Sequence, residues 1–232
     1  MIHVDGVSKR FRGVQVLNEV GLEVCDATVV AILGPSGVGK TVLLRIMAGL
    51  LAPDAGRVTY DGRPMGYGMF ADNRDIIGGL GYVFQGGALF DSMTVAENIA
   101  LPLREALRLS GKEVGRRVQE ALGTVGMWNN AGLRPRVLSG GMTRLVAIAR
   151  AIVTNPRCVF FDEPTAGLDP AMRDRICGLI RSLRDRDRKT EVVVTHDIEA
   201  AREVADRLYM LRGGSLVPAD QVKKEDYEQA YA

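Results

Sequence analysis

The residues with the clearest chemical potential form a glycine-rich run that ends in a lysine and a threonine. Residues 34–41 read GPSGVGKT and fit the pattern G-x-x-x-x-G-K-[ST]. Glycines let backbone N–H groups approach phosphate oxygens, and the start of a helix adds partial positive charge. Lys40 can neutralise the outer phosphates of a nucleotide, and the Thr41 hydroxyl can bind Mg²⁺. The predicted phosphate-binding residues are Gly34, Pro35, Ser36, Gly37, Gly39, Lys40, Thr41 and Val42.

Two adjacent acids form a second candidate site further along the chain. Asp162 and Glu163 follow the apolar run 159–161. Asp162 can complete the shell of a Mg²⁺ ion, directly or through water. Glu163 points elsewhere and can polarise a water molecule that attacks phosphate. Alone, such a pair is also typical of a strand that ends in a helix cap. After a phosphate loop, it predicts a metal ligand and a general base.

The elements around these residues predict an α/β fold. The runs 29–33, 159–161 and 192–194 are apolar without alternation, as in strands buried on both faces of a parallel sheet. Each run precedes a polar or glycine-rich turn and then a helical stretch. Residues 42–49, after the phosphate loop, are expected to be helical. This context also weakens the alternative that the glycine-rich match arose by chance among 27 glycines.

Two regions differ from this parallel pattern. Near the N-terminus, apolar residues alternate up to position 24, and the run at 58–60 meets Asp61-Gly62, a tight-turn pair, which predicts an antiparallel layer. The middle of the chain, about 86–155, is expected to form an inserted helical subdomain. Its expected helices are 101–109, 114–122 and 142–153.

Composition excludes several classes of protein. The chain has 232 residues, with 30 basic and 28 acidic residues, so charge gives no reason to expect a nucleic-acid partner. Its three cysteines lack a CxxC pair, which is typical of reduced thiols. No apolar run approaches the roughly 20 residues that span a membrane, and the start does not look like a signal peptide. If the protein works at a membrane, we expect another chain to supply the spanning part.

Three further motifs indicate a family. Residues 138–142 read LSGGM before a buried helix, 166–169 read AGLD after the two acids, and 195–197 read THD after an apolar run. In this order the chain resembles ATP-binding cassette (ABC) ATPases over nearly its whole length. The resemblance implies a P-loop NTPase core with a mainly parallel sheet, an N-terminal antiparallel β subdomain and an inserted α-helical subdomain. It also implies one domain over residues 1–232, with a C-terminal tail at 218–232.

The resemblance implies a role for each matching residue, with ATP and Mg²⁺ as cofactors. Phe11 resembles the aromatic residue that stacks on adenine, although a core phenylalanine remains the alternative. Gln85 resembles the glutamine that contacts Mg²⁺ and water and responds to the membrane subunit. His196 would hold the γ-phosphate and the attacking water in line. The implied catalytic residues are Glu163, His196, Gln85 and Lys40, and the implied metal ligands are Thr41, Gln85 and Asp162.

The family pattern also implies a head-to-tail dimer. Ser139, Gly140 and Gly141 would bind the γ-phosphate of ATP held by a second copy, and Asp169 would link the two sites. ATP binding would close this dimer, and hydrolysis would reopen it. Two departures stand out. Val42 replaces a common serine or threonine, and the motif 138–142 ends in methionine where glutamine is common.

Among ABC proteins, a transporter subunit fits best. Soluble DNA-repair ATPases carry a long coiled coil, whereas this sequence lacks sustained heptads. Translation factors with two cassettes carry two phosphate loops, whereas this sequence has one. Residues 85–95 and 98–105, with Met142, resemble Mla-type ATPases, which partner a permease and an MCE-domain protein to move phospholipids between membranes. The absence of a membrane-spanning run predicts a peripheral location on the cytoplasmic face of the inner membrane, where a partner holds the protein. The alternatives are an importer of small polar solutes and a lipoprotein- or export-linked ATPase.

Overall fold

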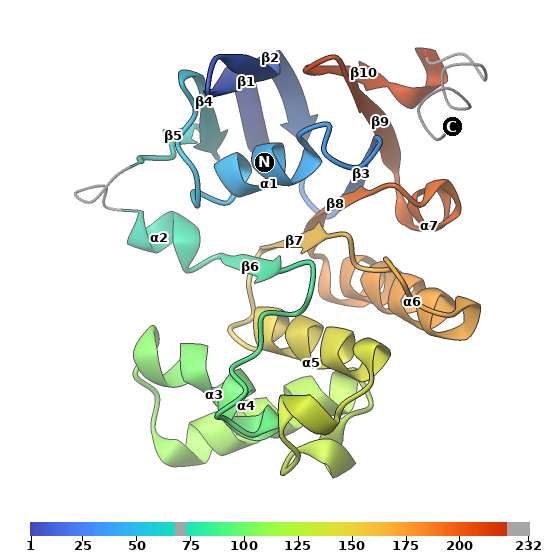
Figure 1. Cartoon of the computed structure of the whole chain (residues 1–232). Helices are drawn as coiled ribbons and strands as arrows, with labels where there is room; N and C mark the ends of the chain where they lie inside the picture. The colour runs from blue at the N-terminus through green and yellow to red at the C-terminus, as the bar shows by residue number, and fades with distance from the viewer. Residues whose placement is uncertain (68–72, 222–232) are drawn as a thin grey trace.

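The computed structural model describes residues 1–67 and 73–221. Figure 1 shows an antiparallel sheet at the top, a larger sheet through the middle and a group of helices below. Helix α1 (Lys40–Met47) lies between the two sheets. Helices α5 (Gly140–Ile152) and α6 (Pro170–Asp187) cover the other face of the larger sheet. The α/β fold predicted from the sequence, with its antiparallel layer and helical insertion, is confirmed.

The larger sheet carries the three apolar runs at its centre. In the described residues its strand order is β10-β9-β3-β8-β7-β6, and all neighbours are parallel except β9 and β10. Residues of β3, β7 and β8 are buried throughout, as expected for strands covered on both faces. The strands are β3 (Val29–Leu33), β6 (Leu80–Val83), β7 (Cys158–Asp162), β8 (Thr190–Thr195), β9 (Arg207–Arg212) and β10 (Ser215–Pro218).

The smaller sheet is antiparallel and covers α1. Val20, Leu22 and Val24 alternate inward along β2, as predicted. Asp61 and Gly62 both have positive φ and form the tight turn between β4 and β5. The strand order is β2-β1-β4-β5 in the described part of the chain. The strands are β1 (Ile2–Phe11), β2 (Val14–Val24), β4 (Ala55–Tyr60) and β5 (Arg63–Pro64).

The helical subdomain contains α3, α4 and α5 and two short 3-10 turns. The expected helix at 101–109 is wrong in position, since α3 spans Val95–Glu105. A reciprocal capping box between Thr94 and Glu97 starts α3 earlier, and Arg108 with φ 50° separates it from the next helix. The remaining elements here are α4 (Gly111–Thr124), η1 (Trp128–Asn130) and η2 (Pro135–Val137).

The central sheet separates two apolar cores. Val30 and Ile32 of β3 face α1 and the antiparallel sheet, whereas Ala31 and Leu33 face α5 and α6. The carboxyl ends of β3, β7 and β8 therefore meet at one edge, beside the start of α1. The remaining elements are α2 (Arg74–Ile77), α7 (Ile198–Val204) and η3 (Ala219–Gln221). Of the tail expected at 218–232, residues 222–232 lie outside the described residues.

Candidate ATP-hydrolysis site

The phosphate loop connects the end of β3 to the first turn of α1. Helix α1 begins at Lys40, two residues before the expected start, with Gly39 as its N-cap at φ 115°. A Cβ on Gly39 would lie 2.8 Å from Cγ1 of Val16, so both backbone conformation and space demand glycine there. The loop thereby directs its backbone N–H groups and the positive end of the α1 dipole toward one cleft.

Lys40 is held at the floor of this cleft. Its Nζ donates hydrogen bonds to the carbonyl oxygens of Gly34 at 2.6 Å and Pro35 at 3.1 Å. The same nitrogen lies 3.1 Å from Oε1 of Glu163. Both side chains are almost fully buried, so their charges are compensated locally and interact more strongly than at the surface. The structure therefore places a fixed positive charge beside a fixed carboxylate.

Thr41 lines the cleft, and the carboxylate of Asp162 lies buried behind it. The Thr41 hydroxyl donates to Oδ1 of Asp162 at 2.7 Å, although the two residues are 121 positions apart. In the described residues, no group of three or more His, Cys, Asp or Glu is arranged to hold a metal. Mg²⁺, however, takes one or two protein oxygens and completes its shell with water and nucleotide phosphates. The Thr41–Asp162 pair, beside a phosphate loop, fits that requirement.

Glu163 lies one residue beyond β7 in a strained conformation. Its φ of 49° is in the left-handed region, which costs a non-glycine residue on the order of 1–3 kcal/mol. Oε2 accepts a hydrogen bond from the backbone N–H of His196 at 3.2 Å and lies 2.9 Å from Nδ1 of the same residue. The carboxylate is thus fixed between Lys40 and His196. Such strain at a held carboxylate is typical of an active site.

The cleft itself joins residues from four stretches of the chain. Its volume is about 260 Å³, and Gln85, Val42 and Glu163 line it together with the phosphate loop. Val16 closes one side, where it touches the position of Gly39. Val42 brings no hydroxyl, so phosphate contacts at this point fall to the backbone. The predicted residues that the structure brings together are Ser36, Gly37, Gly39, Lys40, Thr41, Val42, Gln85, Asp162, Glu163 and His196.

Other predicted residues lie away from this cleft. Phe11 ends β1 with 43% of its surface exposed, and its ring lies 5.5 Å from Nζ of Lys9. Ser139 caps α5 through its hydroxyl, and Asp169 caps α6 in the same way. Ser139 and Asp169 are exposed on the chain surface. They contribute nothing to the cleft of their own chain, as a role toward a second copy requires.

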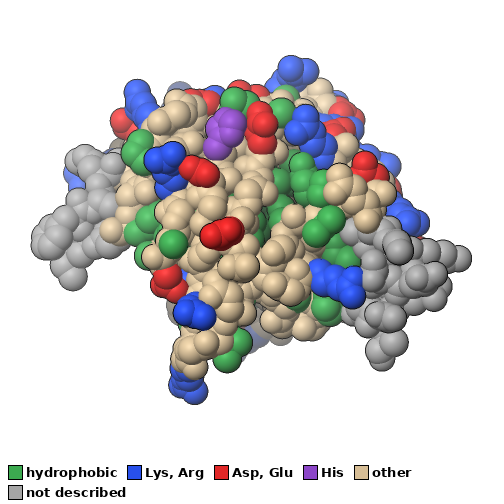
Figure 2. Space-filling model, turned by 90° about the horizontal axis from the view of Figure 1, so that it is seen from above, with side chains coloured by type: hydrophobic (Ala, Val, Ile, Leu, Met, Phe, Trp, Pro, Cys, Tyr) green, Lys and Arg blue, Asp and Glu red, His purple; other side chains and the backbone are tan. Residues whose placement is uncertain are grey.

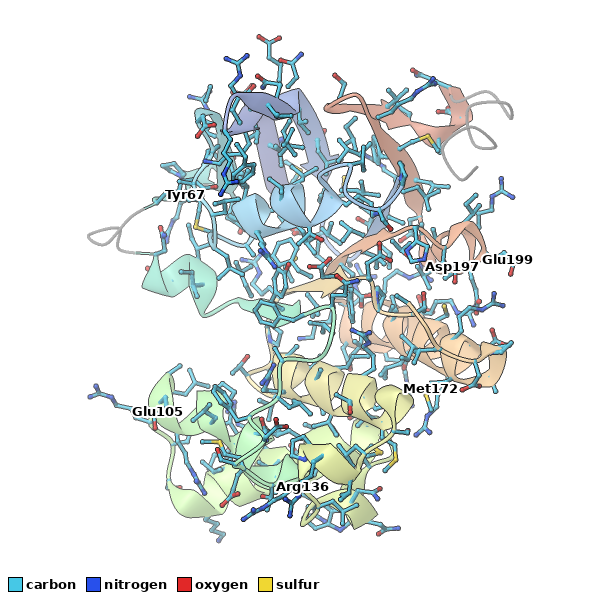
Figure 3. All side chains as sticks on the ribbon, viewed as in Figure 1. Tyr67, Glu105, Arg136, Met172, Asp197 and Glu199 are labelled. Carbon is cyan, nitrogen blue, oxygen red and sulfur yellow. The ribbon has the colours of Figure 1, made fainter. Side chains whose placement is uncertain are left out.

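The two glycines that follow Ser139 differ in their surroundings. A Cβ on Gly141 would lie 2.7 Å from Cγ of Met172, whereas one on Gly140 would meet no other described part of the chain within 4 Å. Figure 3 labels Met172 at the first turn of α6, beside the start of α5. Gly141 is therefore needed for packing between two helices. Gly140 leaves an open surface beside the N-terminus of α5.

Three residues near the cleft were not predicted. Tyr82 donates its hydroxyl to Oδ2 of Asp162 at 3.1 Å, and burial raises its pKa well above the usual value. Arg144 of α5 donates to the carbonyl of Phe84, and burial lowers its pKa. Val16 belongs to β2 of the antiparallel sheet, next to a shift in the register between β1 and β2. The sequence signal for Tyr82 is its position three residues before Gln85.

A parallel sheet, a phosphate loop and an acidic pair at one sheet edge define a P-loop nucleotide hydrolase. The sequence profile of the family described as "ABC transporter" matches residues 17–166. The chain belongs to this family and contains its ATPase domain. In the described residues, no helix is both long and apolar enough to cross a membrane.

Curated relatives cover most of the chain. A sulfate/thiosulfate import ATP-binding protein of Caulobacter vibrioides is 42% identical over 93% of this chain. A methionine import ATP-binding protein of Rhodococcus jostii is 39% identical over 96% of it. The chain spans 63% of the length of the first relative and 67% of the second. The match therefore covers the ATPase domain and leaves part of each relative unmatched.

Solved structures show the same fold. The dimeric post-hydrolysis state of an ATP-binding cassette bound to ADP and phosphate has a TM-score of 0.85 and is 34% identical. That match covers 93% of this chain and 96% of the solved chain. The cbiO1 protein of Clostridium perfringens, part of a transporter complex, has a TM-score of 0.84 at 28% identity. The resemblance to ABC ATPases is thus confirmed at the level of the family.

Proposed function

We propose that this chain is the ATP-hydrolysing subunit of a membrane transporter that imports a small solute. The observation that carries the ATPase part is the fixed carboxylate of Glu163, held 3.1 Å from Lys40 and 2.9 Å from His196 beside a phosphate loop. The import part rests on relatives named for the import of sulfate, thiosulfate or methionine. These relatives favour a small polar solute over the phospholipid expected from the sequence.

The chemistry follows from the residues in the cleft. Lys40 and the loop N–H groups neutralise the phosphate oxygens of ATP, so charge that develops in the transition state is stabilised by groups already in place. Glu163 orients the attacking water and accepts its proton. His196 holds Oε2 of Glu163 and would contact the γ-phosphate from the same side. Thr41 and Asp162 would hold Mg²⁺, which supplies further charge neutralisation on the phosphates.

A second copy of the chain would complete each site. Ser139 and Gly140 lie exposed at the N-terminus of α5, where hydroxyl and N–H groups can bind an anion. Asp169 is exposed at the start of α6 and is available to link two sites. The dimeric cassette bound to ADP and phosphate supports this arrangement by similarity. Two-fold symmetry would then place two ATP molecules between the protomers.

A permease would bind next to Gln85. Phe90 is 50% exposed there, and the buried side chain of Asn98 holds its backbone through hydrogen bonds to both N and O. Arg150 donates to the carbonyls of Gly87 and Ala88 and fixes the same loop to α5. We assign the permease contact to this exposed apolar side chain, because hydrogen bonds hold its loop in place. The chain would thus lie at the membrane surface, on the cytoplasmic face, through its partner.

Phospholipid transport with an MCE-domain partner is the second candidate. The observation in its favour is the sequence of the same loop, residues 86–95, together with Met142 in place of glutamine. Met142 lies in the first turn of α5 and is half-buried against the helical core. Neither feature alters the ATPase chemistry. The two candidates therefore differ in partners rather than in the cleft.

Purification of the tagged chain from its native membranes, followed by mass spectrometry, tests the proposal. A permease with a solute-binding protein is the expected result. Recovery of a permease with an MCE-domain protein would instead support phospholipid as the transported substrate. Recovery of no permease would contradict the transporter assignment. Phe90→Glu should lose the permease, whereas Val14→Glu, a control on exposed β2, should keep it.

A further inference from the structure

The carboxylate of Asp162 is held from two sides. Thr41 of α1 donates to Oδ1 at 2.7 Å, and the hydroxyl of Tyr82 on β6 donates to Oδ2 at 3.1 Å. Asp162 is only 1% exposed, so these two groups replace water as its partners. One donor belongs to the phosphate loop helix and the other to a neighbouring strand. Together they fix the plane of the carboxylate at the end of β7.

Packing fixes the position of Tyr82 itself. In the register of β6 and β7, Tyr82 lies opposite Phe160, two residues before Asp162. Its ring centroid is 4.4 Å from that of Phe84 and 6.3 Å from that of Phe160. The side chain packs against the core around α1. Packing therefore holds the aromatic ring without the hydroxyl, and the hydroxyl donates to Asp162 with the side chain of Arg45 also close to it.

We propose that Tyr82 is a positioning residue that sets the affinity of the site for Mg²⁺ through Asp162. The proposal rests on the ATPase function of the cleft. The hydrogen bond from Tyr82 holds Oδ2 of Asp162. Oδ1 therefore stays beside the Thr41 hydroxyl, and these two oxygens form the predicted metal site. Groups that hydrogen-bond to a metal-binding carboxylate, without touching the metal themselves, commonly contribute to metal affinity by orienting the carboxylate. Tyr82 itself does not line the cleft with the phosphate loop.

The test compares two tyrosine variants by thermal unfolding. Wild type and each variant are mixed with a fixed concentration of ADP, and Mg²⁺ is titrated from an EDTA baseline. In Tyr82→Phe, the Mg²⁺ concentration that gives half of the stabilisation should rise about 10-fold. Binding of ADP in EDTA should not change. The matched control is Tyr67→Phe, because the Tyr67 hydroxyl donates to the carbonyl of Ile46 on α1 at 2.9 Å and does not contact Asp162. Figure 3 labels Tyr67 beside α1.

A double-mutant cycle shows whether Tyr82 acts through Asp162. In an Asp162→Asn background, Tyr82→Phe should produce no further shift in the Mg²⁺ midpoint. An unchanged midpoint in Tyr82→Phe alone, an equal shift in Tyr67→Phe, or a full extra shift in the double variant would each overturn the proposal. A wild-type protein whose ADP binding ignores Mg²⁺ would instead contradict the ATP site itself. A normal wild-type response with an unaffected Tyr82→Phe variant contradicts only the role of Tyr82.

Discussion

Nδ1 of His196 lies 2.9 Å from Oε2 of Glu163, and the backbone N–H of His196 donates to the same oxygen at 3.2 Å. Oε1 of Glu163 faces Nζ of Lys40 at 3.1 Å. Each carboxylate oxygen therefore has its own partner, one on the phosphate loop and one after β8. Because Glu163 also has a positive φ, its direction is set by backbone and side-chain contacts together.

Glu163→Gln should lower ATP hydrolysis by about 100-fold or more, because glutamine cannot accept the proton of the attacking water. The amide has nearly the same shape, so binding of ATP should persist. Phosphate release at saturating Mg²⁺-ATP and nucleotide binding at equilibrium measure the two properties. Glu199→Gln on α7 is the matched control, since Glu199 pairs with Arg173 at the surface. Hydrolysis that continues at the wild-type rate in Glu163→Gln would show that another group is the base.

Ser139 has a structural role and a proposed catalytic one, and two variants separate them. Its hydroxyl accepts a hydrogen bond from the N–H of Met142 and caps α5. Ser139→Ala should lower the free energy of unfolding by about 1 kcal/mol, whereas Ser139→Asp should keep the cap. Denaturant unfolding measures this difference.

The same two variants probe the proposed contact with a second copy. In Ser139→Asp, a carboxylate would face the γ-phosphate of ATP on the other protomer. Hydrolysis should therefore fall by about 100-fold although the fold is retained. Activity measured against protein concentration separates this loss from weaker dimerisation. If Ser139→Asp hydrolysed ATP normally, the serine would be only a helix cap.

Much of this architecture is predictable because its signals are local. The phosphate loop, the apolar strands and the turn at Asp61-Gly62 depend on short stretches of residue types. The displacement of α3 was also visible in principle, since Thr94 and Glu97 form a capping box that competes with the apolar spacing at 101–109. In contrast, the contact of Tyr82 with Asp162 depends on which strands are neighbours in the sheet. That order cannot be read from residue types along the chain.

The distribution of charge illustrates a second limit of sequence analysis. Figure 2 shows basic and acidic side chains interspersed over the face seen from above, in keeping with the balanced composition. Composition predicts such balance but cannot show which charges are buried. Glu191, for example, is a charged residue by type, but it lies in β8 beside the apolar run and its exposure is 0%. The role of Ser139 toward a second chain is likewise invisible in one chain.

The two glycines of the signature should respond differently to alanine. Gly141→Ala should lower the free energy of unfolding by about 1 kcal/mol, because the new Cβ would crowd Met172 at 2.7 Å. Gly140→Ala is the matched control, because its new Cβ would meet no neighbouring element among the described residues, and it should change stability by no more than about 0.5 kcal/mol. Urea unfolding of both variants measures the difference. Equal stabilities would contradict the packing role assigned to Gly141.

Glu191 makes stability depend on pH. Its side chain lies within the central sheet, on the face covered by α6, and among the described residues neither carboxylate oxygen has a hydrogen-bond partner. Burial raises its pKa well above the usual value; Arg184 opposes the rise, whereas Asp185, Asp206 and Asp187 add to it. The folded protein therefore keeps a proton on Glu191 that the unfolded chain loses near the ordinary glutamate pKa of about 4.3.

The sign follows from proton binding. Between the unfolded-state pKa and the raised folded-state pKa, the folded state binds more protons, so the free energy of unfolding falls as pH rises, by at most about 1.4 kcal/mol per pH unit from this group. Glu191→Gln, which resembles the protonated acid, should remove this loss. Urea unfolding from pH 5 to pH 9 should show the variant gaining on wild type as pH rises. Glu23→Gln removes an exposed carboxylate from β2 and is the control. Parallel pH profiles for wild type and Glu191→Gln would mean that Glu191 does not bind the extra proton, because a neutral glutamine cannot titrate.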